Sequence, residues 1–139
     1  MGTGKGVAMA NYGMSASVLG SMDEVKEKTV AALKTQGFGI LTEIDMQKTL
    51  KEKIGAEFEP YLILGACNPR LANQALSADR SIGLLLPCNV VLRKTGSTVE
   101  VSIQDPEVMF SVVEMGENPE FAKLPGEAKQ LLQTALKSL

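Results

Sequence analysis

The alternation of apolar and polar residues along the chain predicts a β-sheet covered by helices. Every second residue is apolar from Thr98 to Gln104, the pattern of a strand with one buried face. A looser alternation runs from Tyr12 to Leu19, with its Met, Ala and Val residues facing inward. The run from Tyr61 to Cys67 is almost continuously apolar, which is typical of a fully buried strand. Strands are therefore predicted at residues 12–19, 39–43, 61–67, 82–94 and 98–104.

Three details refine these predicted strands. Pro87 cannot donate a hydrogen bond to a neighbouring strand, so we expect a break or bulge within residues 82–94. Thr95-Gly96 predicts a tight turn that joins this strand to residues 98–104 as a hairpin. Ile40 and Ile44 are expected on one face of the strand that begins at Gly39.

Helix-start signals lie between the predicted strands. Ser21 is followed three residues later by Glu24, the spacing of a capping box, and Gly37 is placed to end that helix. Asn68-Pro69 and Asp105-Pro106 each combine a capping side chain with a proline, which needs no donor at the first helical position. Helices are therefore predicted at residues 21–36, 46–53 (capped by Asp45), 69–78, 106–113 and 125–138.

The order of these elements predicts an α+β fold. A strand and a helix come first, then two strands separated by short helices, then the hairpin and a last helix. This order favours a single antiparallel-rich sheet with helices packed on one face. With 139 residues the chain is long enough for one domain with its own core, and we assign residues 1–139 to it, with 1–6 flexible.

Composition excludes several classes of function. Aromatic residues make up 4% of the chain, so the core must be aliphatic. The 14 Lys and Arg residues are balanced by 16 Asp and Glu residues, so we expect no nucleic-acid partner. No apolar run approaches the roughly 20 residues of a membrane-spanning helix, and no secretory signal is recognisable, so no membrane association is expected. We therefore expect a cytoplasmic protein whose two cysteines are free thiols.

The chain contains no histidine, and this narrows the chemistry further. Without imidazole there is no Ser-His-Asp or Cys-His catalytic unit. Most zinc and non-haem iron sites also need histidine ligands. Any general base would have to be Asp, Glu, Lys or a thiolate, and whether the protein is an enzyme stays open.

Two Cys-Asn pairs form the one arrangement in the sequence that resembles a site. Cys67-Asn68 follows the apolar run 61–66, and Cys88-Asn89 follows the apolar run 82–87. Two interior strands that end in the same pair would bring both thiols and both amides to one edge of the sheet. The candidate ligand-binding residues are therefore Cys67, Asn68, Cys88 and Asn89.

Each candidate also has a purely structural interpretation. Cys67 precedes a helix, whose dipole would lower the pKa of the thiol, but a buried cysteine can equally be a small core residue. Cys88 depends on proximity to Cys67, because two thiols could bind a soft ion such as Cu(I), with Met14 or Met109 as a thioether ligand. For Asn68 we favour the helix-capping role, whereas Asn89 has no such local role.

The segments Gly65-Ala66-Cys67-Asn68-Pro69, Leu84 to Val90 and Asp105-Pro106 resemble the signature segments of the family of domains of unknown function catalogued as 302. The resemblance runs from about Tyr12 to the C-terminal helix. It implies a small α+β fold similar to one repeat of the TATA-box-binding protein, with the order strand, helix, four strands, helix. It also implies a homodimer from bacteria or archaea. It does not imply nucleic-acid binding, because that fold is shared by unrelated activities, and it supplies no catalytic residues that could be carried over to this sequence.

Three hypotheses for the function follow from these observations. The leading one is a dimeric protein that binds a small ligand or a soft metal near Cys67 and Cys88, with the cofactor unknown. The second is a thiol-dependent redox or sulfur-transfer protein that uses Cys67. The third is a structural or partner-binding dimer with both cysteines in the core.

Overall fold

A computed structural model gives the structure of the protein and describes residues 8–9, 11–113 and 119–139. The strands among these residues are β1 (Ala8–Met9), β2 (Gly13–Leu19), β3 (Gly39–Asp45), β4 (Tyr61–Cys67), β5 (Cys88–Thr95) and β6 (Thr98–Gln104). The helices are α1 (Met22–Thr35), α2 (Met46–Ile54), α3 (Pro69–Ala78), α4 (Pro106–Met109) and α5 (Pro119–Lys137), and the 3₁₀ helices are η1 (Arg80–Leu85) and η2 (Phe110–Val112). The predicted flexible segment 1–6 lies outside the described residues.

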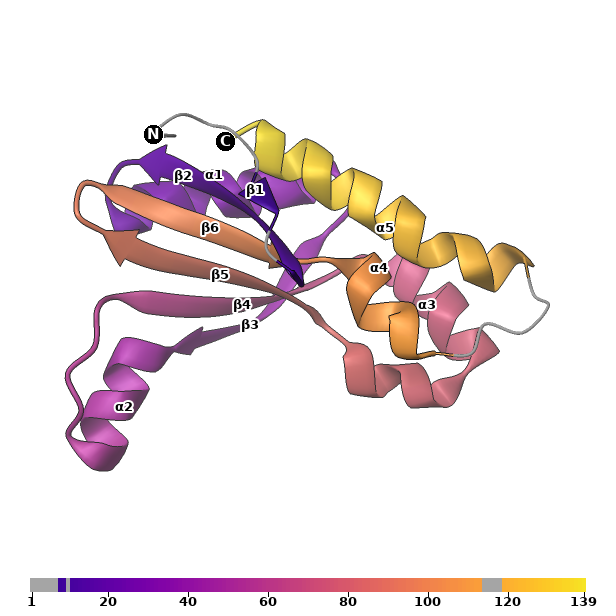
Figure 1. Ribbon diagram of the computed structural model, residues 1–139, viewed down its shortest axis with the longest axis horizontal. Coiled ribbons are helices and arrows are strands. Elements are labelled where there is room, and N and C mark those ends of the chain that lie inside the picture. Colours follow the sequence, from indigo (N-terminus) through magenta and orange to yellow (C-terminus); the bar gives the residue numbers. More distant parts are fainter. Residues whose placement is uncertain (1–7, 10, 114–118) are drawn as a thin grey trace.

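The strands form one antiparallel sheet in the order β1-β2-β6-β5-β4-β3 (Figure 1). Each strand from β3 to β6 pairs with the next along the chain, and β2 then joins the far side of β6. Helix α5 packs against α1, α3 and α4 and covers the same face of the sheet as α1. The predicted α+β fold with helices on one face is therefore confirmed.

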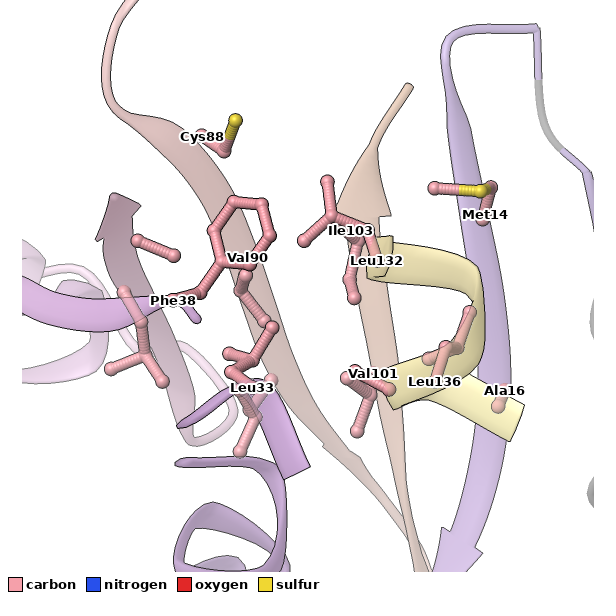
Figure 2. Packing of buried hydrophobic residues seen from close by; sticks show 14 of the residues in the cluster. Met14, Ala16, Leu33, Phe38, Cys88, Val90, Val101, Ile103, Leu132 and Leu136 are labelled. Carbon is pink, nitrogen blue, oxygen red and sulfur yellow. The ribbon is translucent and has the colours of Figure 1, made fainter. Parts of the chain in front are cut away.

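The core lies between this sheet face and helices α1 and α5 (Figure 2). The inward residues of β2 and β6 alternate as predicted, and Val101 and Ile103 lie beside Leu132 and Leu136 of α5. Leu33 of α1 is fully buried on the same side of the sheet. The core is built mainly of aliphatic side chains, because few aromatic residues are available to it.

Local capping chemistry sets the helix ends, as predicted. Ser21 and Glu24 form the capping box of α1, with the Glu24 backbone N–H donating to Ser21 Oγ at 3.1 Å. Asp45 caps α2 by accepting from the Lys48 backbone N–H at 2.9 Å. Gly55 ends α2 in the left-handed conformation, which glycine adopts at low cost.

The predicted strand over residues 82–94 is wrong in its first half. Residues 80–85 form the 3₁₀ helix η1, and β5 begins only at Cys88. Asp79 caps η1 by accepting from the Ser81 backbone N–H, and Leu84 is 89% exposed. The apolar run therefore forms a helical turn outside the sheet. Of the η1 residues, Ile82 alone is fully buried in the core.

Residues 39–45 and 61–67 also differ from their predicted patterns. A register shift between Ile40 and Thr42 places Ile40 beside Ala66 on the helix-covered face and Ile44 beside Ile63 on the opposite face. The two isoleucines therefore do not share a face, because one extra residue reverses the alternation. The β4 residues on the helix-covered face, Leu62, Leu64 and Ala66, are all buried, whereas Ile63 on the other face is half-buried, so β4 is not buried on both faces along its length.

The last helix begins earlier than predicted. Helix α5 starts at Pro119 and contains Pro125, which the sequence pattern places at the helix start. Phe121 and Leu124 are both buried in the core, and this packing favours the additional helical turns. No helix in the described parts of the chain is both long and apolar enough to cross a membrane.

Candidate functional site

Two neighbouring strands bring the cysteines to the same end of the sheet. Cys67 is the last residue of β4 and Cys88 is the first residue of β5. The two strands are antiparallel, and Cys88 lies opposite Ala66. The expectation that both cysteines end a strand is wrong for Cys88, but the antiparallel pairing still places it next to the end of β4.

Both cysteines line one cavity of about 50 Å³, which we call the cysteine cavity. It lies between the end of β4, the start of β5 and helices α3, α4 and α5. Its wall includes two phenylalanines and four alanines, and Asn68 is its one polar amide. The lining residues are Phe38, Ala66, Cys67, Asn68, Leu71, Ala72, Ala75, Leu86, Cys88, Pro106, Phe110, Leu124, Pro125 and Ala128.

The Cys67 thiol is half-buried and stays protonated at neutral pH. Burial raises its pKa above the ordinary value of 9.0. The pKa is therefore raised and not lowered as the position before α3 suggested, and the cause is desolvation of the thiolate by burial. A neutral thiol is a poor nucleophile and a poor metal ligand.

The Cys88 thiol is more deeply buried, with 8% of the residue exposed. Burial raises its pKa to about 11, and the nearby Cys67 adds to the shift. Figure 2 shows Cys88 at the start of β5, on the same strand as the core residue Val90. The cavity therefore presents two uncharged sulfur atoms, and both cysteines are free, as predicted.

Asn68 has a structural role that uses both ends of its amide. Its Oδ1 accepts from the Leu71 backbone N–H at 3.3 Å, which caps α3. Its Nδ2 donates to the Gln36 backbone carbonyl at 3.4 Å and so connects α3 to the end of α1. The predicted capping role is confirmed, and these two bonds use one of the amide's two donor positions and one of its two acceptor positions.

Asn89 does not join the other three candidates. It lies opposite Gly65 and is exposed, whereas Cys88 beside it lies opposite the buried Ala66. Successive side chains of a strand point to opposite faces, so Asn89 faces away from the helices. The structure therefore gathers Cys67, Asn68 and Cys88 around one cavity and leaves Asn89 on the open face of the sheet.

Among the described residues, the surroundings of the two thiols supply no Asp or Glu as a third metal ligand. Within residues 8–9, 11–113 and 119–139, no group of three or more Cys, Asp or Glu residues is placed to hold a metal ion. Met14 is fully buried in β2 and Met109 belongs to α4, and neither lines the cysteine cavity. A soft metal would have to be held by two thiols that both resist ionisation.

Several cavity residues were not among the sequence candidates. Ala72 and Ala75 come from α3, and Leu124 and Ala128 come from α5. Alanines on the inner stripes of two helices were a usable signal, since small side chains leave room where helices meet a sheet. Their convergence on the cysteines depends on the helix packing, which residue spacing alone does not give.

Comparisons with known proteins place the chain in one family. The model of the family described as domain of unknown function DUF302 matches residues 14–139. The structure is also similar to that of an uncharacterised conserved DUF302 protein from Bacillus stearothermophilus, with a TM-score of 0.81 and 25% sequence identity. This likeness covers 91% of the present chain and 97% of the other. A search among curated proteins found no match.

Proposed function

The chain belongs to the DUF302 family of domains of unknown function, and we propose that it binds a small ligand of low polarity in the cysteine cavity. The resemblance of its Cys-Asn and Asp-Pro segments to that family is confirmed by the family match and by the structural likeness. The observation that carries the proposal is that two neutral thiols from adjacent strands line one apolar cavity.

The size of the cavity restricts what can enter. Its volume of about 50 Å³ is about a third of the roughly 150 Å³ of an engineered apolar cavity that binds benzene. A short alkyl or alkylthio group matches this space. Soft, polarisable sulfur also makes favourable contacts with aromatic rings, and Phe38 and Phe110 supply such rings in the wall.

The other hypotheses have less support from the geometry. A thiol-dependent reaction at Cys67 needs a thiolate or a neighbouring base, whereas its thiol is neutral and the cavity wall contains no Asp, Glu or Lys. A soft-metal site needs ionised thiols, and burial disfavours ionisation of both. A purely structural role for the cysteines is the outcome that an experiment must separate from ligand binding.

Xenon is a suitable probe because it is small and apolar and occupies apolar protein cavities. We expect xenon to change the amide chemical shifts of Cys67, Leu71 and Cys88 in a proton–nitrogen correlation spectrum. Ala75→Val should abolish the response, because the larger side chain fills the cavity. Ala31→Val on the exposed face of α1 is the matched control and should leave the response unchanged.

Two results would contradict ligand binding at this position. The first is that xenon leaves the spectrum of the wild-type protein unchanged. The second is that the chemical-shift changes caused by xenon persist in Ala75→Val. If Ala75→Val raised the stability of a protein that ignored xenon, the cavity would be a packing defect. The cysteines would then be core residues, as in the structural hypothesis.

We also infer that the protein forms a homodimer through the segment from β3 to the start of β4. Four large apolar side chains of this segment are exposed: Leu41, Ile44, Ile54 and Phe58. Helix α2 buries none of its residues and lies apart from α5 (Figure 1). Among the described residues, β3 pairs with β4 alone, so its outer edge is free to pair with the same edge of a second copy.

A further inference from the structure

A second hollow lies on the face of the sheet that the helices leave uncovered, and we call it the open-face cleft. Its volume of about 510 Å³ falls within the roughly 300–1,000 Å³ of small-molecule sites. Its floor is made of small residues of β2 and β6, namely Gly13, Ser15 and Ser102. Ser15 lies opposite Ser102 and the two hydroxyls share a hydrogen bond of 2.9 Å, so the floor satisfies its own polar groups.

One wall of the cleft is fixed by a buried residue. Tyr12 and Met109 line this side, and both are connected to Asp105, which is 2% exposed. The Asp105 backbone N–H donates to the Tyr12 carbonyl at 2.9 Å, and the Met109 N–H donates to the Asp105 carbonyl at 3.0 Å. The Asp105 carboxylate is itself paired with Lys129 at 2.9 Å. These bonds hold the backbone of Tyr12 and Met109 in place on this side of the cleft.

The charges in the cleft already neutralise one another. Arg93 and Glu100 line it and form an ion pair at 3.0 Å, and Glu59 lies 3.8 Å from the same guanidinium. The pKa of Arg93 is raised by these carboxylates, its hydrogen bond to Glu100 being the main cause. No unpaired charge among the described lining residues would therefore select a cation or an anion.

Hydrogen-bonding groups without a protein partner face the same space. Gln104 Oε1 accepts from the Asn89 backbone N–H at 3.0 Å, and among the described residues the Gln104 amide nitrogen has no acceptor, so it can donate to a ligand. Within the part of the chain that the structure describes, the Asn89 side-chain amide makes no hydrogen bond to protein. Two neighbouring amides thus offer donors and acceptors, and Tyr12 and Tyr61 supply aromatic surface.

From these observations we propose that the open-face cleft binds a small uncharged planar ring that carries adjacent donor and acceptor groups, such as a cyclic amide. The amides of Asn89 and Gln104 hydrogen-bond to the donor–acceptor edge, and the Tyr12 ring at the same end of the cleft contacts the ring surface. The site is distinct from the cysteine cavity, because its floor is the opposite face of the sheet. It also gives Asn89 a role that local structure does not require.

Uracil tests this proposal, since it is a neutral planar cyclic amide small enough for the cleft. In a titration followed by proton–nitrogen correlation spectroscopy, we expect saturable shifts at Asn89, Ser102 and Gln104, with a dissociation constant in the millimolar range. Ser15→Leu should abolish these shifts by filling the floor. Ser17→Leu is the matched control, because Ser17 lies on the same strand and face but outside the cleft, and it should bind as the wild type does.

A second variant tests the hydrogen bonds to the ligand separately from the shape of the cleft. Asn89→Ala removes an exposed amide without filling the floor, so it should keep the fold and lose the uracil shifts. The proposal is overturned if uracil produces no saturable shifts, if the shifts persist in Asn89→Ala and Ser15→Leu, or if benzoate binds as well as uracil. Because xenon reports on the other side of the sheet, its result is independent of this one.

Discussion

Burial sets the protonation of both cysteines, and with it the chemistry open to them. Cys67 and Cys88 line an apolar cavity, and desolvation raises the pKa of each thiol. For Cys88 the value reaches about 11, so the folded protein holds this proton well above neutral pH. The thiols therefore act as uncharged parts of a binding surface, and they also couple folding to alkaline pH.

Stability should fall at alkaline pH because of Cys88. The unfolded thiol ionises near 9.0 and the folded thiol near about 11, so between these values the unfolded chain has released a proton that the folded chain retains. The free energy of unfolding then decreases as pH rises, by up to roughly 3 kcal/mol for this group. Urea denaturation under reducing conditions, at a series of pH values from 8 to about 11, measures the slope.

Other groups also titrate at alkaline pH, so the effect of Cys88 appears as a difference between variants. Cys88→Ala should show a shallower loss of stability with pH than the wild type. Cys67→Ala should stay closer to the wild-type slope, because Cys67 is more exposed. Equal slopes in the wild type and Cys88→Ala would contradict the raised pKa.

Three of the four candidate site residues could be found from the sequence because they lie next to strand and helix ends. Cys67-Asn68-Pro69 marks the end of β4 and the start of α3 directly. Which face Cys88 and Asn89 occupy depends on where β5 begins, and that follows from the packing of Ile82 and η1. The inner alanines of α3 and α5 are visible as helix stripes in the sequence, but their convergence on the cysteines depends on helix packing and could not be predicted.

At the scale of elements, Gly65 allows β3, β4 and the residues before β5 to pack closely. A Cβ atom at this position would lie 2.3 Å from Thr42 Oγ1 and 2.8 Å from Pro87 Cγ. Thr42 is the direct partner of Gly65 in β3, and Pro87 precedes the first residue of β5. Glycine is thus required at position 65 because there is no room for a Cβ atom. This position lies at the end of the sheet that carries the cysteines.

Gly65→Ala should destabilise the protein by roughly 1–3 kcal/mol, the usual cost of overpacking. Gly39→Ala is the control on the neighbouring strand, because a Cβ atom there meets nothing within 4 Å. It should change the free energy of unfolding by less than about 0.5 kcal/mol. Urea denaturation of the two variants tests this, and similar stabilities would show that Pro87 and Thr42 move aside easily.

Elements whose ends are set by a few adjacent residues could be predicted, whereas elements whose form depends on packing against distant segments could not. The capping box at Ser21, the Asn-Pro and Asp-Pro starts and the hairpin at Gly96 each depend on a few adjacent residues. The bulge after Ile40 and the 3₁₀ helix before Pro87 depend on how distant segments pack. An apolar run alone does not distinguish a strand from such a helix.

At the scale of the whole molecule, the proposed homodimer has a direct test. Leu41→Lys in β3 and Ile54→Lys in α2 place a charge in the proposed interface and should weaken dimerisation at least about tenfold, equivalent to ~1.4 kcal/mol. Leu84→Lys is the control, because Leu84 is also an exposed leucine but lies on η1, outside the proposed interface. Sedimentation velocity over a concentration series measures the assembly. A monomeric wild type, or equal dissociation of all three variants, would refute this interface.

The position of β2 in the sheet also determines the order in which a nascent chain can fold. Ser15 of β2 and Ser102 of β6 are 87 residues apart in the sequence, yet they are direct partners. On the ribosome, strands β3, β4 and β5 can pair with one another as soon as each has emerged. Strand β2 is synthesised before all of them but must wait, with Met14 and Val18 still in water, until residues 98–104 leave the exit tunnel. Strand β2 therefore joins β6 late in translation although it is synthesised early, and during that interval its apolar residues are open to contact with a chaperone.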